Sequence, residues 1–214
     1  MRLRNISGSR ERIAQSPLVV HEPEKLRGRW QRRFGNAHPL RIEIGMGKGK
    51  FIHELAARNP GVNYIGIEKY SSVLLRALEK MDELPLSNLL FIRMDAEEIT
   101  EVFGEGEVDR IYLNFSDPWP KERHARRRLP SAEFLARYER ILKRGGVLEF
   151  KTDNKALFDF ALGELPGAGW AIRALTFDLH HDGQMKTDNV TTEYEEKFSS
   201  QGNPIYKYVI NRQH

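Results

Sequence analysis

Short apolar runs alternate with amphipathic segments along most of this chain. The runs are rich in Ile, Leu, Tyr and Phe and have the length of buried strands. They occupy residues 39–45, 63–68, 88–95, 108–115 and 147–153. Apolar residues recur at helical spacing within 51–56, 73–81, 134–142 and 157–162, and Gly145-Gly146 follows the third of these segments as a helix stop. This alternation predicts an α/β fold with a parallel sheet covered on both faces.

The pattern differs at both ends of the chain. Residues 170–179 and 204–212 predict two long strands, and no helical periodicity is evident between them. Residues 1–35 lack clear periodicity, so we expect a basic N-terminal arm that is extended and can be flexible, docked at its end by Trp30 and Phe34. Residues 36–214 show no boundary or repeat and are expected to form one domain.

Composition limits the class of protein. The chain has 214 residues, 40% of them hydrophobic and 30% charged, which suits one domain with one buried core. It contains no cysteine, which excludes disulfides, cysteine-ligated zinc and thiol nucleophiles. The N-terminus has no apolar signal region, and no apolar stretch approaches the length of a membrane span. We therefore expect a cytoplasmic protein that does not bind membranes.

Positive charge is concentrated in two places, although the net charge is only +4. Arginines and lysines greatly outnumber acids before residue 34, and residues 121–128 carry five cations beside Glu122. Such runs suit a polyanion, most simply a nucleic acid. Either run alone is explained equally well by a solvated charged surface. Both together favour nucleic acid as a partner.

The first predicted strand runs into a glycine-rich turn. The order is Glu43, Gly45, Gly47 and Gly49, each separated by one residue. Glycines let the backbone approach a ligand closely, although a plain strand-to-helix turn also uses one or two of them. The alternating spacing does not match a dinucleotide fingerprint or a P-loop. With Glu43 beside it, the turn suits a ligand that carries a positive group.

An acid lies at or just after the end of each of the five predicted strands. After Glu43 these are Glu68, Asp95, Asp117 and Asp153. Glu68 is placed to accept hydrogen bonds from ribose hydroxyls, and Asp95 from an adenine amino group. A single acid in such a place is usually a helix N-cap. Five in succession predict an acidic rim around a cationic, ribose-bearing cofactor.

Residues 114–129, NFSDPWPKERHARRRL, combine a lone acid with a basic cluster. Pro118 and Pro120 restrict the backbone around Asp117, and Trp119 offers a flat surface, unless it only packs the core. NFSDPWP also superficially matches the loop that exocyclic-amine methyltransferases use to hold a planar amino group. The neighbouring histidines of DLHHDG, residues 178–183, lack metal-ligand spacing, so we expect no metal site.

Six segments occur here in one order: IEIGMGKGKF, YIGIE, MDAEEI, YLNFSDPWPKERHARRRL, FKTDN and TTEYEEKF. From about Trp30 onward the chain closely resembles the bacterial tRNA (guanine-N7-)-methyltransferase family. SDPWPK-x-RH and TEYEEKF are specific signatures, whereas many S-adenosylmethionine-dependent methyltransferases share the glycine turn. The resemblance implies the Rossmann-like methyltransferase fold, with a mostly parallel seven-stranded sheet and a C-terminal antiparallel hairpin.

The resemblance also implies a reaction, methyl transfer from S-adenosyl-L-methionine to N7 of guanine at position 46 in the variable loop of tRNA. The implied cofactor-binding residues are Glu43, Gly45, Gly47, Glu68, Asp95 and Asp117. The implied substrate-binding residues are Lys121, Asp153, Thr192, Glu193, Tyr194 and Glu195. The segment matching the tRNA contacts includes Arg123, His124, Arg126, Arg127 and Arg128.

Guanine N7 carries a lone pair and no proton, so the reaction needs alignment and electrostatics rather than a strong base. We expect Asp117 to be the catalytic residue, acting on the guanine edge or on the moving positive charge. Two alternatives stay open, an exocyclic-amine nucleic-acid methyltransferase and a non-catalytic RNA-binding protein with a relict cofactor fold. The sequence is compatible with a monomer or a homodimer.

Overall fold

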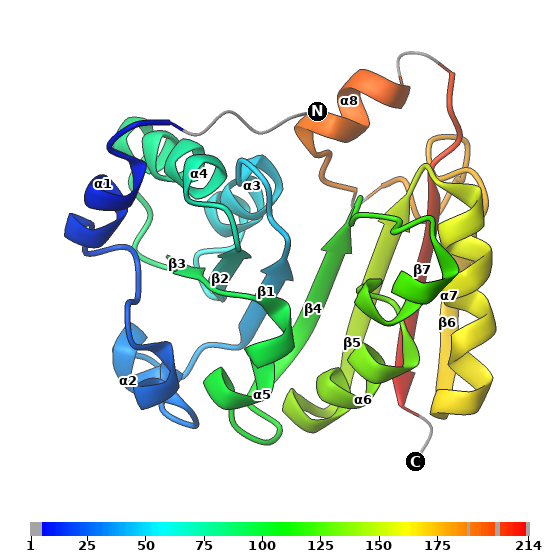
Figure 1. Cartoon of the computed structure of the whole chain (residues 1–214), viewed down its shortest axis with the longest axis horizontal. Helices are drawn as coiled ribbons and strands as arrows, with labels where there is room; N and C mark the ends of the chain where they lie inside the picture. Colours follow the sequence, from blue (N-terminus) through cyan, green and yellow to red (C-terminus); the bar gives the residue numbers. More distant parts are fainter. Residues whose placement is uncertain (1–5, 188, 200–201, 213–214) are drawn as a thin grey trace.

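A single seven-stranded sheet organises the protein (Figure 1), and the computed structural model describes residues 6–187, 189–199 and 202–212. The strands lie in the order β3-β2-β1-β4-β5-β7-β6. Their bounds are β1 (Leu40–Ile44), β2 (Asn63–Glu68), β3 (Leu89–Arg93), β4 (Val108–Asn114), β5 (Leu142–Thr152), β6 (Trp170–Thr176) and β7 (Tyr206–Arg212). β1 to β5 pair in parallel, whereas β7 is antiparallel to β5 and β6. The expected fold class is confirmed.

Helices connect the strands and cover both faces of the sheet. The α-helices are α1 (Ser9–Gln15), α2 (Trp30–Phe34), α3 (Lys50–Arg58), α4 (Ser71–Glu83), α5 (Ile99–Val102), α6 (Ala132–Ile141), α7 (Lys155–Ala168) and α8 (Glu193–Ser199). The 3-10 helices are η1 (Pro23–Leu26), η2 (Ala96–Glu98) and η3 (Glu122–Arg127). No helix within the described residues is long and apolar enough to cross a membrane.

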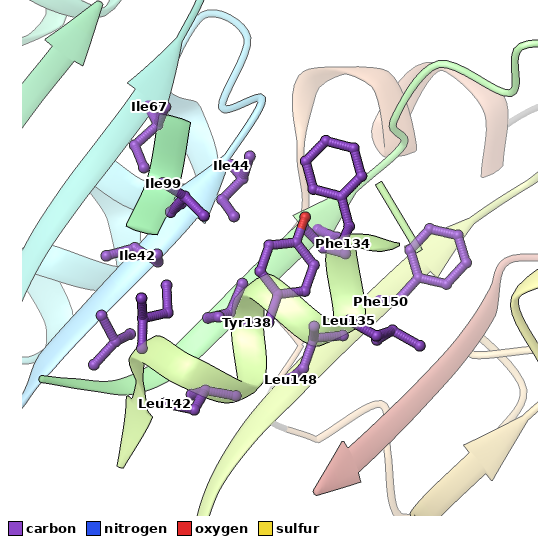
Figure 2. Packing of buried hydrophobic residues seen from close by; sticks show 14 of the residues in the cluster. Ile42, Ile44, Ile67, Ile99, Phe134, Leu135, Tyr138, Leu142, Leu148 and Phe150 are labelled. Atoms are coloured by element: carbon purple, nitrogen blue, oxygen red, sulfur yellow. The ribbon is translucent and has the colours of Figure 1, made fainter. Parts of the chain in front are cut away.

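The core forms two layers, one on each face of the sheet. One cluster joins strand residues to α5, α6 and α7, and Figure 2 shows Leu135 and Tyr138 of α6 among side chains of β1 and β5. The other joins the opposite face to α1, α3 and α4, with Phe51, Leu74 and Phe91 among its buried members. Because both faces are covered, the central strands are apolar on both sides, which explains their continuous hydrophobic runs.

The N-terminal segment differs from the extended arm that we expected. It contains α1, η1 and α2, and Ile13, Val19 and Trp30 are all buried. Val19 forms a parallel bridge with Phe91 of β3, and the Trp30 ring stacks on Phe103 at 5.5 Å. These apolar residues are too irregularly spaced along the chain to show a helical or strand period, although each is buried in one of the two core clusters. Whether residues 1–35 and 36–214 are separate units stays a prediction.

Two further elements differ from the expected pattern. Strand β5 starts at Leu142 and runs through Gly145-Gly146, where we expected the preceding helix to end. A short helix, α8, lies between the last two strands where we expected none. The Thr192 hydroxyl accepts a hydrogen bond from the backbone N–H of Glu195, so a local cap supports a helix too short for periodicity to reveal.

The strand order reverses beside β1, since β2 lies on one side of it and β4 on the other. In open α/β sheets ligands bind outside the carboxyl ends of the strands at this point. Figure 1 shows α8 beyond the carboxyl ends of β4 and β5. The fold therefore directs attention to the ends of β1, β2, β4 and β5.

Candidate functional site

The turn after β1 brings backbone rather than side chains to this edge. Gly45, Gly47 and Gly49 all have positive φ angles, of 73°, 59° and 77°. At Gly49 an added Cβ would lie 2.7 Å from the Cβ of Ala77 in α4, so a side chain has no room there. The turn is thus held close to α4 and leaves an open backbone surface at Gly45 and Gly47.

Glu43 lies at the centre of the switch point and is almost fully buried, with 1% of its surface exposed. Its Oε1 accepts a hydrogen bond of 2.7 Å from Asn114 Nδ2, whereas its Oε2 is buried without a partner among the described residues. Burial raises the pKa of Glu43 to about 8, although Asn114 and Lys151 oppose this shift. A buried carboxylate with an unused oxygen is poised to accept a cation or a proton.

Glu68 ends β2 beside the same turn. It accepts hydrogen bonds from the backbone N–H groups of Gly47, at 3.2 Å, and Tyr70, at 2.9 Å. Burial raises the pKa of Glu68, and nearby Asp117 acts in the same direction. The two amides fix this carboxylate at the end of its strand, so Glu68 lies beside the glycine turn that follows Glu43, and the cofactor-binding role expected of both acids stays a prediction.

Asp95 follows β3 and is more exposed than the first two acids. It caps η2 by accepting from the Glu97 N–H at 3.2 Å, and Lys69 donates to its other oxygen. Partial burial opposes ionisation, but these hydrogen bonds hold the pKa of Asp95 below its usual value. Asp95 is therefore a charged carboxylate that follows β3, and its place in an acidic rim stays a prediction.

The loop after β4 carries two unusual backbone conformations around Asp117. Phe115 and Trp119 both have positive φ, of 50° and 41°, which bulky residues rarely adopt. Each such residue costs about 1–3 kcal/mol and persists only where its surroundings impose it. Asp117 itself is exposed between them. A strained loop at a strand end that presents one exposed acid is typical of a functional site.

Arg128 imposes much of this loop conformation. Its guanidinium donates to the carbonyl oxygens of Pro118, at 3.0 Å, and Trp119, at 3.1 Å, and it packs over the ring of Phe160. The Phe115 N–H adds a bond to the Lys151 carbonyl. Arg128 is half-buried, and its Nε and Nη2 are used to hold the loop. Its expected contact with RNA stays a prediction.

The other basic residues of this segment face outward. Lys121 precedes η3, and Arg123, Arg126 and Arg127 are exposed on or beside it. The Arg127 guanidinium lies 5.1 Å from the centre of the Trp119 ring, and the His124 ring meets the same tryptophan edge-on. Arg126 also pairs with Glu133 at 3.0 Å while staying 86% exposed. Trp119 is only half-buried, so it is covered by these cations rather than by the core.

The segment around α8 is anchored by a buried ion pair that the sequence did not reveal. Lys151 Nζ, on β5, donates to Glu195 Oε2 at 2.5 Å, to the Val190 carbonyl at 2.7 Å and to Asn189 Oδ1 at 3.1 Å. Glu195 is fully buried and also accepts from Asn189 and lies 3.2 Å from His180 Nε2. Glu195, predicted to bind substrate, is thus enclosed in protein.

The remaining predicted substrate residues lie around this anchor. The Tyr194 hydroxyl donates to Asp153 at 3.2 Å, and its ring lies 5.0 Å from that of Phe115 in the strained loop. Glu193 pairs with Lys80 of α4 at 3.1 Å. Tyr194, Asp153 and Phe115 therefore come together from three separate segments, on the side of α8 that faces the loop after β4.

Lys151 and Asn114 are the functional candidates that sequence reasoning missed. Both lie in strands that read as apolar, and both are buried with their polar atoms bonded. The sequence does contain one sign of them, because a lysine and an asparagine are unusual within strands that are otherwise apolar and buried. Their partners, Glu195 and Glu43, lie far away in the sequence, so no local pattern links them.

Known proteins resemble this chain over nearly its whole length. The family described as putative methyltransferase matches residues 37–208. A tRNA (guanine-N(7)-)-methyltransferase of Lachnoclostridium phytofermentans is 61% identical over 213 residues, covering 100% of this chain and 99% of that protein. A protein of the same name from Geobacillus kaustophilus is 51% identical over 208 residues, covering 97% and 95%.

Solved structures share the fold at low sequence identity. An antibiotic-related methyltransferase has a TM-score of 0.66 at 20% identity, covering 87% of this chain and 94% of that one. A 16S rRNA methyltransferase has a TM-score of 0.63 at 14% identity, covering 85% and 91%. Phosphoethanolamine N-methyltransferase 2 of Haemonchus contortus, solved with S-adenosyl-L-methionine, has a TM-score of 0.55 at 13% identity, covering 86% and 51%.

Proposed function

This chain belongs to the bacterial tRNA (guanine-N7-)-methyltransferase family, and from that premise we propose that it methylates N7 of guanine at position 46 in the variable loop of tRNA, with S-adenosyl-L-methionine as the methyl donor. The observation that carries the proposal is the buried Glu43 carboxylate with its unpartnered oxygen at the switch point. A cationic ligand group is the partner that such a carboxylate requires.

The residues of the strand ends fit this donor. Glu43 would accept its positively charged part, and the open backbone at Gly45 and Gly47 leaves room for close approach. Glu68 and Asp95 offer carboxylate oxygens for its ribose and base. When bound, S-adenosylmethionine would supply an electrophilic methyl group on its sulfonium sulfur, which a neutral nitrogen can take as the carbon–sulfur bond breaks and the sulfur leaves as a neutral thioether.

Asp117 provides the electrostatic part of the reaction. Guanine N7 needs no proton removed, but the ring becomes cationic as the methyl group arrives. Asp117 stands exposed at the end of β4, where its charge stabilises that developing cation or holds the guanine edge. Its position is fixed by the positive-φ residues Phe115 and Trp119 and by Arg128, so little reorganisation is needed during transfer.

A second group of residues orients the RNA. Arg123, Arg126 and Arg127 present charge to phosphates on the surface beside Asp117. Tyr194, 43% exposed and packed against Phe115, offers a ring for a base turned out of its stack. Lys151 and Glu195 act indirectly, because their buried pair fixes the segment that carries Tyr194.

The test is product analysis with the purified full chain. We would incubate it with methyl-labelled S-adenosylmethionine and a tRNA transcript carrying guanine at position 46, then digest the RNA and separate the nucleosides. The matched control is the same transcript with adenine at that position. We expect labelled 7-methylguanosine with the first transcript and none with the second. An N2- or N6-methylated nucleoside would favour the exocyclic-amine alternative, and RNA binding without any label would favour a relict cofactor fold.

A further inference from the structure

A cavity of about 550 Å³ lies on the sheet face that carries α3. Strands β1, β4, β5 and β7, with Ala174 of β6, form its floor. Its walls are formed by α3 and by Gln184, Met185, Thr187, Asn189 and Val190. At the carboxyl ends of β4 and β5 the cavity reaches Asn114 and Lys151. Most of its other lining residues lie nearer the amino ends of the strands, away from the glycine turn and from Asp117. The residues proposed for methyl transfer do not account for it.

The floor of this cavity holds two like-charge pairs. Arg41 of β1 is directly opposite Arg110 of β4, and Lys151 of β5 is directly opposite Lys207 of β7. All four residues line the cavity, so their side chains share one face of the sheet. Like charges directly opposite each other in neighbouring strands destabilise a sheet. This arrangement is therefore costly unless an anion offsets it.

Carboxylates of the protein offset only part of this charge. Lys151 is neutralised by Glu195, as described above. Glu149 bridges Arg110 and Lys207, with distances of 2.7 and 2.9 Å. Burial opposes its ionisation, but Lys207 and Arg110 together hold the pKa of Glu149 below its usual value, so it is charged.

Arg41 has no carboxylate partner within the described part of the chain. Its Nη1 donates to the Tyr112 hydroxyl at 3.4 Å, and the Tyr64 hydroxyl is a second phenol partner of the same guanidinium. Arg58 also lines the cavity, and Glu54 pairs with it. The remaining cations, Arg41, Arg110 and Lys207, stand against the single Glu149, which leaves two positive charges in the cavity. Two charges is the amount that one phosphate group would balance.

We propose that this cavity is a phosphate-binding site, in which Arg41, Arg110 and Lys207 hold the phosphate group of a ligand. Guanidinium groups suit phosphate because their planar forks match its oxygens, and Glu149 holds Arg110 and Lys207 in place for contact. The volume lies within the usual range for a small-ligand site, about 300–1,000 Å³. The phosphate can belong to a free polyphosphate or to the backbone of an RNA.

The first experiment measures thermal unfolding of the full chain with and without inorganic pyrophosphate. The test variant is Arg41→Gln with Lys207→Gln, which removes one cation from each like-charge pair. The control is Arg144→Gln, an exposed arginine near the other end of β5 with no ion pair within the described residues. We expect pyrophosphate at ten times its dissociation constant to raise the Tm of wild type and control by about 3–6 °C.

The double variant should lose this rise. Without pyrophosphate the double variant lacks the like-charge repulsion but also the ion pair from Lys207 to Glu149, so a single cooperative unfolding transition, rather than the value of its Tm, shows that it folds. If the double variant is poorly folded, Arg41→Gln alone serves, because it leaves the bridge from Glu149 to Arg110 and Lys207 intact. An equal rise in wild type and the folded variants would overturn the proposal.

The second experiment identifies the source of the phosphate. The salt dependence of tRNA binding is measured for the same three proteins. A slope that falls by about 1 in the double variant, but not in Arg144→Gln, assigns the site to an RNA phosphate. An unchanged slope with a pyrophosphate response assigns it to a free ligand. If pyrophosphate does not raise the Tm of the wild type, and the salt slope of the wild type equals that of the double variant, the phosphate-binding proposal is overturned. The methyl-transfer proposal is tested by its nucleoside product and would be unaffected.

Discussion

Replacing Glu43 by glutamine probes the charge balance of the proposed cofactor site. Glutamine keeps the size of the side chain and an oxygen to accept from Asn114, but it cannot ionise. Burial raises the pKa of Glu43 from its ordinary 4.5 to about 8. At about 1.4 kcal/mol for each pKa unit, keeping this carboxylate ionised in the folded protein costs up to about 5 kcal/mol.

The sign of the effect follows from proton binding. Below pH 4.5 the Glu43 carboxyl is protonated in both states and contributes no pH dependence. As the pH rises from 4.5 to about 8, the unfolded chain loses this proton while the folded chain keeps it. The free energy of unfolding of the wild type should therefore fall across this window relative to Glu43→Gln, by up to about 5 kcal/mol.

Urea unfolding of the ligand-free protein at several pH values between about 5 and 9 measures this difference. The matched control is Glu101→Gln, at an exposed position of α5. Comparison with this variant separates the effect at Glu43 from that of replacing any exposed acid by glutamine. A difference between Glu43→Gln and wild type that stayed constant across the window would refute the assignment of an ionisation penalty to Glu43.

The same residue links cofactor binding to proton release. Near neutral pH the ligand-free Glu43 is mostly protonated, so accepting a cationic group requires it to lose its proton. Titration calorimetry with S-adenosylmethionine in two buffers of different ionisation enthalpy should detect that release in the wild type. The Glu43→Gln variant should bind more weakly and release no proton. Equal proton release by both proteins would contradict the role of Glu43.

Three further predictions follow from the site. Lys151→Met should lower the free energy of unfolding by about 3–5 kcal/mol, because it leaves the buried Glu195 carboxylate without its cation. Denaturant unfolding should show that Lys151→Met/Glu195→Gln is less destabilised than the two single changes added together. Simple additivity would count against an energetic coupling of Lys151 with Glu195. Asp117→Ala should lower kcat about a hundredfold or more without weakening tRNA binding, and near-normal turnover would remove Asp117 from the mechanism. Arg126→Ala with Arg127→Ala should weaken tRNA binding and reduce its salt slope by about 1–2 in filter-binding assays, whereas an unchanged slope would show that these arginines do not meet phosphates.

The periodic part of the sequence predicted most of the fold. Strands β1 to β4 appear as continuous apolar runs because helices cover both faces of the sheet, and each run is short enough to exclude a helix. The acids at the strand ends were found for the same reason, since the end of a parallel strand fixes which edge of the sheet a residue occupies. The docking of Trp30 and Phe34 was predicted and is confirmed. The helices α1, η1 and α8 escaped prediction because they are short and bury few apolar residues.

Arg128 illustrates why a side chain's task could not be read from its neighbours in the chain. It belongs to a run of cations whose composition indicates contact with RNA. Its guanidinium nevertheless bonds to the carbonyl groups of Pro118 and Trp119 and packs over Phe160. Composition identified the kind of surface, and only the folded loop showed which cation is turned inward.

Sequence alone determined the α/β architecture, the glycine turn and the ring of strand-end acids, because each depends on local periodicity or on a position along one strand. The tertiary structure decided which charges face each other. Lys151 finds Glu195 44 residues away, and strand register sets Arg41 beside Arg110 and Lys151 beside Lys207. A local sequence pattern does not show which distant segments pair with each other. The Lys151–Glu195 ion pair and the charged cavity could therefore be identified only in the folded sheet.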